Sequence, residues 1–137
     1  MIQRIQSIWL FLAAVCTFLT INLSFYSGTN AIGVPYQQLN AGNGGFLLLA
    51  LTIIIGTLAF VNIFMFKNRR LQLRLCVAGI VLEAVLLFLY YKAVTLFTQG
   101  TYSLTALLHS AILIFFMLAA RGIKKDEDLI RDSERLR

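Results

Sequence analysis

The sequence is poor in charged residues. Asp, Glu, Lys and Arg make up 13% of its 137 residues, whereas apolar residues make up 59%. An average soluble domain is about a quarter charged, and a water-soluble fold of this length could not cover so much apolar surface. The scarcity of charge therefore excludes an ordinary soluble domain.

Histidine and cysteine are also scarce. The chain has one histidine, His109, and two cysteines, Cys16 and Cys76, which lie inside hydrophobic runs. One deep histidine cannot build a Ser/His/Asp or Cys/His catalytic set, and no cluster of His, Cys and carboxylates has the spacing of a metal site. We therefore expect no enzymatic activity, no metal and no cofactor, and we expect both cysteines to act as small buried apolar side chains.

Four long apolar runs make up most of the chain. A helix needs about 20 apolar residues to cross a bilayer, because the hydrocarbon offers no water to the backbone. The runs cover residues 5–26, 46–66, 75–97 and, as a shorter one, 104–120. We expect the first run to be retained, because it is long for a signal peptide. The prediction is an all-α integral membrane protein, with a four-helix bundle and short loops over residues 1–120.

Basic residues lie on one side of these spans. All of the 12 Lys and Arg residues except Lys92 precede the first span, connect the second to the third, or follow the fourth. Lys and Arg in short loops stay on the cytoplasmic side, so both termini are predicted to be cytoplasmic. Those nearest the bilayer are expected to contact anionic lipid heads or a partner: Lys67, Arg69, Arg70, Arg74, Arg121, Lys124 and Lys125.

The segment after the fourth span, residues 121–137, mixes both signs of charge. Its six basic and five acidic residues interleave at helical spacing, as in Lys124 with Asp128. A thin apolar stripe accompanies them: Ile123, Leu129, Ile130 and Leu136. The pattern predicts a short cytoplasmic helix, and the near-neutral charge argues against a nucleic-acid partner. Docking on a protein and a solvated helix are equally compatible with this pattern.

Glu83 is the only acidic residue inside a predicted span. A charge in lipid is costly and marks a candidate functional site. Counting about 1.5 Å per residue from Leu71 puts Glu83 about 18 Å from the inner surface, and counting from Arg121 puts His109 at about the same depth. Because a short polar hairpin joins the third and fourth spans, we predict that Glu83 and His109 pair. The favoured role of this pair is structural, as a polar contact that holds two helices together, and the alternative is a proton or ion relay.

Other polar residues give weaker predictions. By the same count Cys16, Gly56 and Thr57 are expected to share a central polar layer with the pair. Asn62, near the inner end of the second span, is expected to reach interfacial water rather than to bond across helices.

The first outer connection, residues 27–45, carries no charge. Its glycines and Pro35 favour turns over a folded domain. Its apolar residues could let it fold back on the bundle or meet a partner: Ile32, Val34 and Leu39. A flexible polar cap is an equal alternative.

Several stretches on the predicted cytoplasmic side resemble a known family. They are MIQRIQ at residues 1–6, RLQLRLC at 70–76, RGIKKDE at 121–127 and SERLR at 133–137. Together they resemble the bacterial membrane proteins called domain of unknown function 4293, over nearly the whole chain. The resemblance implies a four-span protein of the bacterial inner membrane and supplies no activity or catalytic residue.

Three functions are compatible with these features. The favoured one is a small non-enzymatic accessory or assembly subunit of a larger inner-membrane complex, because a catalytic set is lacking and the tail has the pattern of an ordered helix. The alternative is a small proton- or ion-coupled transporter, acting as a homo-oligomer through Glu83. A third is lipid sensing by the basic turn at Lys67, Arg69 and Arg70.

Overall fold

The structure, a computed structural model, describes residues 2–33 and 37–135. Over these residues the chain forms four helices: α1 (Ile2–Leu19), α2 (Phe46–Phe64), α3 (Arg69–Val94) and α4 (Leu107–Arg135). Three short strands accompany them: β1 (Tyr26–Asn30), β2 (Gln37–Leu39) and β3 (Phe97–Tyr102). A single 3-10 turn, η1 (Leu104–Ala106), leads into α4.

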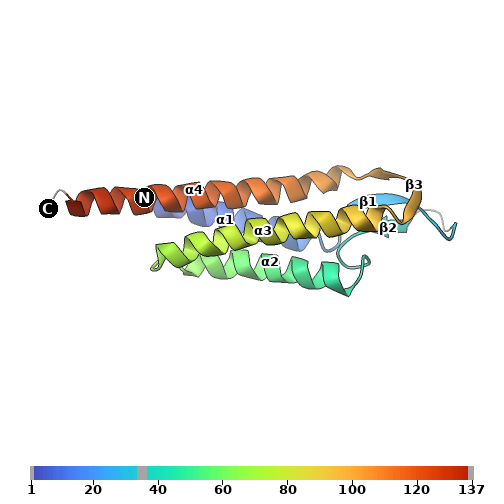
Figure 1. Ribbon diagram of the computed structural model, residues 1–137, viewed down its shortest axis with the longest axis horizontal. Helices are drawn as coiled ribbons and strands as arrows, with labels where there is room; N and C mark the ends of the chain where they lie inside the picture. Colours follow the sequence, from blue (N-terminus) through green and yellow to red (C-terminus); the bar gives the residue numbers. More distant parts are fainter. Residues whose placement is uncertain (1, 34–36, 136–137) are drawn as a thin grey trace.

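The helices lie side by side along the long axis of the molecule (Figure 1). Helix α1 packs against α2 and α4, and α3 packs against the same two helices. The strands lie at one end, and the turn between α2 and α3 lies at the other (Figure 1). We call these the sheet end and the charged end.

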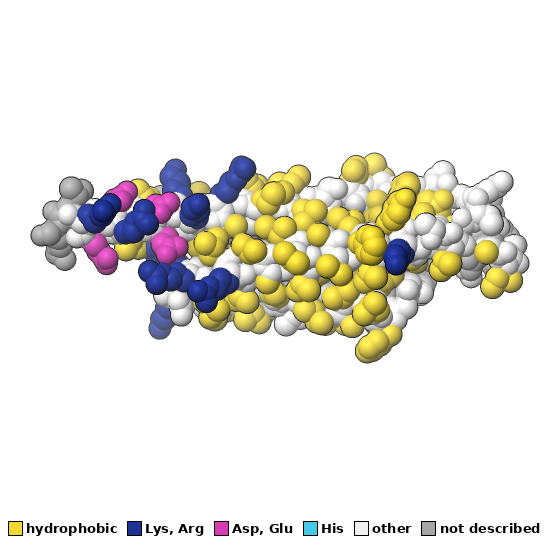
Figure 2. All heavy atoms as spheres, viewed as in Figure 1, with side chains coloured by type: hydrophobic (Ala, Val, Ile, Leu, Met, Phe, Trp, Pro, Cys, Tyr) yellow, Lys and Arg dark blue, Asp and Glu magenta, His cyan; other side chains and the backbone are white. Residues whose placement is uncertain are grey.

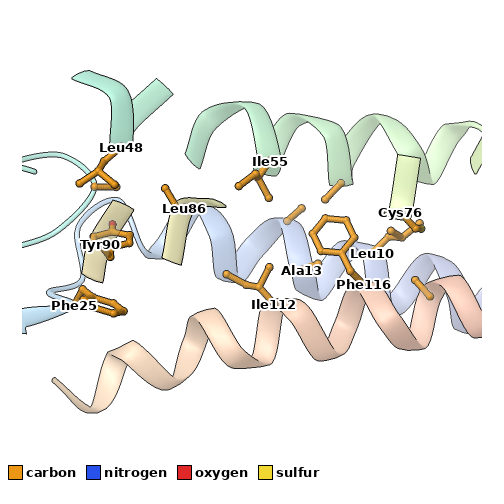
Figure 3. Close-up of a cluster of buried hydrophobic side chains, with 14 of the residues drawn as sticks. Leu10, Ala13, Phe25, Leu48, Ile55, Cys76, Leu86, Tyr90, Ile112 and Phe116 are labelled. Carbon is orange, nitrogen blue, oxygen red and sulfur yellow. The ribbon is translucent and has the colours of Figure 1, made fainter. Parts of the chain in front are cut away.

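Apolar side chains meet along the axis of the helical bundle. Leu10 of α1, Ile55 of α2, and Ile112 and Phe116 of α4 point toward one another (Figure 3) and are fully buried. Helix α3 comes close to this cluster at Gly79, where an added Cβ would lie 2.6 Å from Cε1 of Phe116. The absence of a side chain at this position therefore lets α3 and α4 pack tightly.

The strands form one antiparallel sheet in the order β2-β1-β3. Tyr26 of β1 pairs with Leu39 of β2 and with Tyr102 of β3. Gly28 faces Gly100, and a Cβ on Gly28 would lie 2.1 Å from the backbone oxygen of Gln99. Glycine is therefore required for β1 and β3 to approach.

The sheet corrects the prediction of an all-α fold with short loops. Over its described part the first outer connection contains the expected turns, at residues 31–32 and 41–43. Its strand β1 also pairs with β3 in the connection between α3 and α4, and Leu39 is buried. Val34 and Pro35 lie outside the described residues. The first predicted span was also too long, because α1 ends at Leu19. Residues 20–22 form a turn instead, in which the Ile21 and Asn22 amides donate to the Phe18 and Leu19 carbonyls.

Three of the described helices, α2, α3 and α4, are long and apolar enough to cross a membrane. The apolar part of α1, Ile5–Leu19, is shorter. Apolar side chains cover the middle of the surface, and acidic and most basic side chains gather at the charged end (Figure 2). This distribution is that of a membrane protein.

The charged segment that follows the predicted fourth span continues α4 without a break to Arg135. The helix therefore extends past the other helices at the charged end (Figure 1). Of the apolar stripe predicted for this segment, Ile123 is buried, whereas Leu129 and Ile130 are exposed. Leu136 lies outside the described residues.

Candidate functional site

The structure brings Glu83 and His109 together inside the bundle. Glu83 comes from the buried face of α3 and His109 from the first turn of α4. His109 Nδ1 lies 2.6 Å from Glu83 Oε1, and the two residues are 2% and 0% exposed. A separation this short is typical of a charge-assisted hydrogen bond. The pairing predicted from helix depth is therefore present.

Two aromatic rings cover the pair on the side of the sheet. Phe25, just before β1, stacks on Tyr90 of α3 with ring centroids 4.5 Å apart. Both rings also contact His109, at centroid distances of 5.4 Å for Phe25 and 5.0 Å for Tyr90. Tyr90 is fully buried beside Phe25 (Figure 3). The reason is that it lies two helical turns from Glu83, on the same face of α3.

Two polar atoms of this cluster have no hydrogen-bond partner. Among the described side chains, Glu83 Oε2 and the Tyr90 hydroxyl are both buried and unpaired. Buried polar atoms in proteins are nearly always bonded to protein or to ordered water. The cluster is therefore incomplete as a set of protein groups alone.

The wider polar layer predicted around the pair does not form. Thr57 points to the exposed side of α2, and Gly56 packs against the Phe18 ring. Cys16 is only half-buried. The depth count brought Glu83 and His109 to the same level, but it carried no information on which face of its helix each residue occupies.

A second polar cluster joins α2 to α3 near the charged end. Asn62 is fully buried, and its Nδ2 donates to the Gln72 carbonyl at 3.3 Å and to Cys76 Sγ at 3.2 Å. Gln72 Nε2 donates in return to the Asn62 carbonyl at 3.1 Å. The prediction that Asn62 reaches interfacial water is therefore wrong. Gln72 and Cys76 are four positions apart and therefore lie on one face of their helix. This spacing could have indicated a polar contact with Asn62 across the helices.

A third cluster, at the charged end, was missed in the sequence. Gln6 Nε2 of α1 donates to Asp126 Oδ2 of α4 at 2.6 Å, and both side chains are buried. Arg69 Nη1 donates to the Asp126 carbonyl at 3.2 Å. Nearby, Arg70 Nε lies 3.3 Å from Glu127 Oε1. These contacts attach the charged part of α4 to α1 and to the first turn of α3.

The predicted basic contact residues separate into two groups. Lys67, Arg69 and Arg70 line a surface hollow of about 430 Å³ together with other groups: Phe66, Asn68, Glu127 and Ile130. The remaining ones are exposed on the helices away from the hollow: Arg74, Arg121, Lys124 and Lys125. The structure therefore gathers three of the basic residues at one surface site.

Among the described residues, no three His, Cys, Asp or Glu side chains come together in a group that could hold a metal ion.

Comparison with known proteins gives one match. A search of curated proteins and a search of solved structures each returned none. The family model described as a domain of unknown function (DUF4293) matches residues 2–136. Because this match covers nearly the whole chain, the protein belongs to the DUF4293 family.

Proposed function

We propose that this protein is a non-enzymatic accessory or assembly subunit of a larger complex in the bacterial inner membrane. In this proposal all four helices cross the bilayer, and both termini are cytoplasmic. Helix α1 supports the fourth crossing because it packs between α2 and α4 and presents exposed apolar side chains outward: Ile5, Ile8, Phe11 and Val15. The cytoplasmic position of both termini is supported by the basic residues at the charged end, because Lys and Arg in short loops stay on the cytoplasmic side.

The observation that carries the proposal is the projecting end of α4. This part of α4 is held in place by the buried Gln6–Asp126 hydrogen bond and by the hydrogen bond from Arg69 to the Asp126 carbonyl. Beyond them Leu129 and Ile130 are 50% and 43% exposed. An apolar pair on a fixed helix is suited to contact another protein.

The hollow next to Ile130 defines the chemistry of the partner. Lys67, Arg69 and Arg70 contribute three positive charges to its lining, and Glu127 contributes one negative charge. Phe66 and Ile130 add apolar surface. An acidic, amphipathic segment of a membrane partner would complement this site, and Lys124 and Lys125 would face anionic lipid heads.

Photo-crosslinking from the projecting end tests this function. We expect a benzoylphenylalanine at Ile130 to give an adduct with a second protein in native membranes. The matched control carries the same group at Ile32, which is exposed at the opposite end, and should give none. Adducts from Ile130 that contain only lipid or this protein itself would refute the proposal.

The Glu83–His109 contact favours a second candidate, a small proton- or ion-coupled transporter that acts as a homo-oligomer. A buried acid beside a histidine is an arrangement used to relay protons in membranes. In liposomes, a transporter should dissipate an imposed pH gradient, and Glu83→Gln should abolish this while Glu127→Gln does not. If the pH gradient dissipated at the same rate with each of the three proteins as in protein-free liposomes, Glu83 would have only a structural role between the helices.

A further inference from the structure

The buried side chains of α4 recur at alternating intervals of three and four residues. They are His109, Ile112, Phe116, Ala119, Ile123 and Asp126. This is the repeat by which nearly parallel helices pack on one another in a bundle, and we call this row of positions the packing seam of α4. The next two positions in the repeat are Ile130 and Ser133, and both are exposed. The packing seam therefore continues past the part of α4 that is covered.

The cover ends at Asp126. Gln6 of α1 and Arg69 of α3 both donate hydrogen bonds to this residue. From there α4 continues to Arg135 and extends past the other described helices (Figure 1). Ile130 is 43% exposed although it occupies a packing position. Within the described part of the chain, no helix covers this continuation, which leaves one side of α4 ready for a helix from elsewhere.

The hollow lies where this uncovered part of the seam meets the bundle. Ile130 lines it together with three cations and one acid: Lys67, Arg69, Arg70 and Glu127. The last turn of a helix leaves its carbonyl groups without partners and carries a partial negative charge, which Lys and Arg stabilise. A helix N-terminus in the same place would bring positive charges together. The hollow therefore favours the C-terminal end of a helix.

We infer that the projecting part of α4 binds one amphipathic helix of the partner protein, antiparallel to α4. Its apolar stripe packs on Ile130 and Ser133, and its acidic C-terminal end lies in the hollow. This inference deepens the proposed function and rests on it. Two copies of this chain in one membrane share one orientation, so their α4 helices run parallel. The antiparallel orientation therefore assigns the helix to a different protein.

A photo-crosslinking scan in native membranes tests the helix packing. Benzoylphenylalanine is placed in turn at Ile130, Ser133, Asp132 and Arg135, all of which are exposed. The first two positions and the last two have the same spacing, but they differ by a rotation of about 200° around α4. We expect adducts with one partner protein from Ile130 and Ser133, and loss of these adducts at Asp132 and Arg135.

Mass spectrometry of the adducts tests the orientation. The partner residues captured from Ile130 and Ser133 should be three or four positions apart, as on one face of a helix. A probe at Asn68, which lines the hollow, should capture a partner residue that lies C-terminal to both. All four changes in the scan are at exposed positions of the projecting part, so the fold of the bundle is not affected.

The possible results distinguish this inference from the proposed function. Equal adducts from the two faces, no adduct from Asn68, or capture there of a residue N-terminal to the other two overturns the antiparallel helix. Each of these results still leaves a protein partner in place. Protein adducts from none of the positions refute the proposed function, and the inference fails with it.

Discussion

Each end of the bundle buries one carboxylate, and the two are stabilised differently. Glu83, below the sheet, is fully buried and paired with the ring nitrogen of His109. Asp126, at the charged end, is 7% exposed and accepts a hydrogen bond from the neutral amide of Gln6. A carboxyl group close to water can exchange a lost partner for solvent, whereas one deep in apolar surroundings depends entirely on its protein partner. The comparison predicts that equivalent deletions at the two sites have different costs.

The largest effect is expected from His109→Ala. It leaves Glu83 buried without its partner, which typically costs about 3–5 kcal/mol of unfolding free energy. Chemical unfolding in detergent measures the loss. The double variant Glu83→Met with His109→Leu removes both polar partners and should regain most of the stability, because apolar replacements of a buried pair are often neutral. A double variant as unstable as His109→Ala would show that the unpaired Glu83 carboxyl group is not the cause of the loss.

A smaller loss is expected from Asp126→Ala. The change leaves the Gln6 amide without its acceptor, which costs about 1–3 kcal/mol. Asp128→Ala is a suitable control, because Asp128 forms only a solvent-exposed pair with Arg131. The same unfolding assay should separate the two variants. If Asp126→Ala were as costly as His109→Ala, the distinction between the two ends would fail.

The smallest effect is expected from Arg70→Ala. Its side chain is 84% exposed, and the ion pair with Glu127 is therefore screened by solvent. Such pairs contribute about 0–1 kcal/mol. Unfolding should be nearly unchanged, while crosslinking from Ile130 to a partner should fall if the hollow takes part in docking. A large loss of stability would show that this pair has a structural role.

The sequence was sufficient to predict the helices and the Glu83–His109 contact. Long apolar runs located all four helices, although α1 ends earlier and α4 ends later than the predicted spans. A short hairpin sets α3 and α4 antiparallel, so equal depth brings the two residues together. In contrast, the sheet depends on pairing between Tyr26 and Tyr102, which are far apart in sequence. Short strands in connections rich in Gly and Thr give no hydropathy signal.

The contacts of Gln6 and Asn62 could not be predicted for a different reason. Gln6 meets Asp126 across 120 positions of the sequence, and the contact depends on how α1 is rotated against α4. Hydropathy gives the depth of a residue but only weakly indicates its helix face when the apolar surface surrounds the helix. Asn62 was placed at the correct depth, yet its orientation toward α3 determines that it is buried.

The unbroken length of α4 gives the protein a mechanical property. The helix carries His109 in its first turn and Asp126 where its charged part begins, about 25 Å apart along its axis at about 1.5 Å per residue. A hydrogen-bonded helix transmits rotation and sliding along its length with little loss. A partner that rotated or pulled the projecting end of α4 would therefore also move the His109 imidazole, which contacts Glu83.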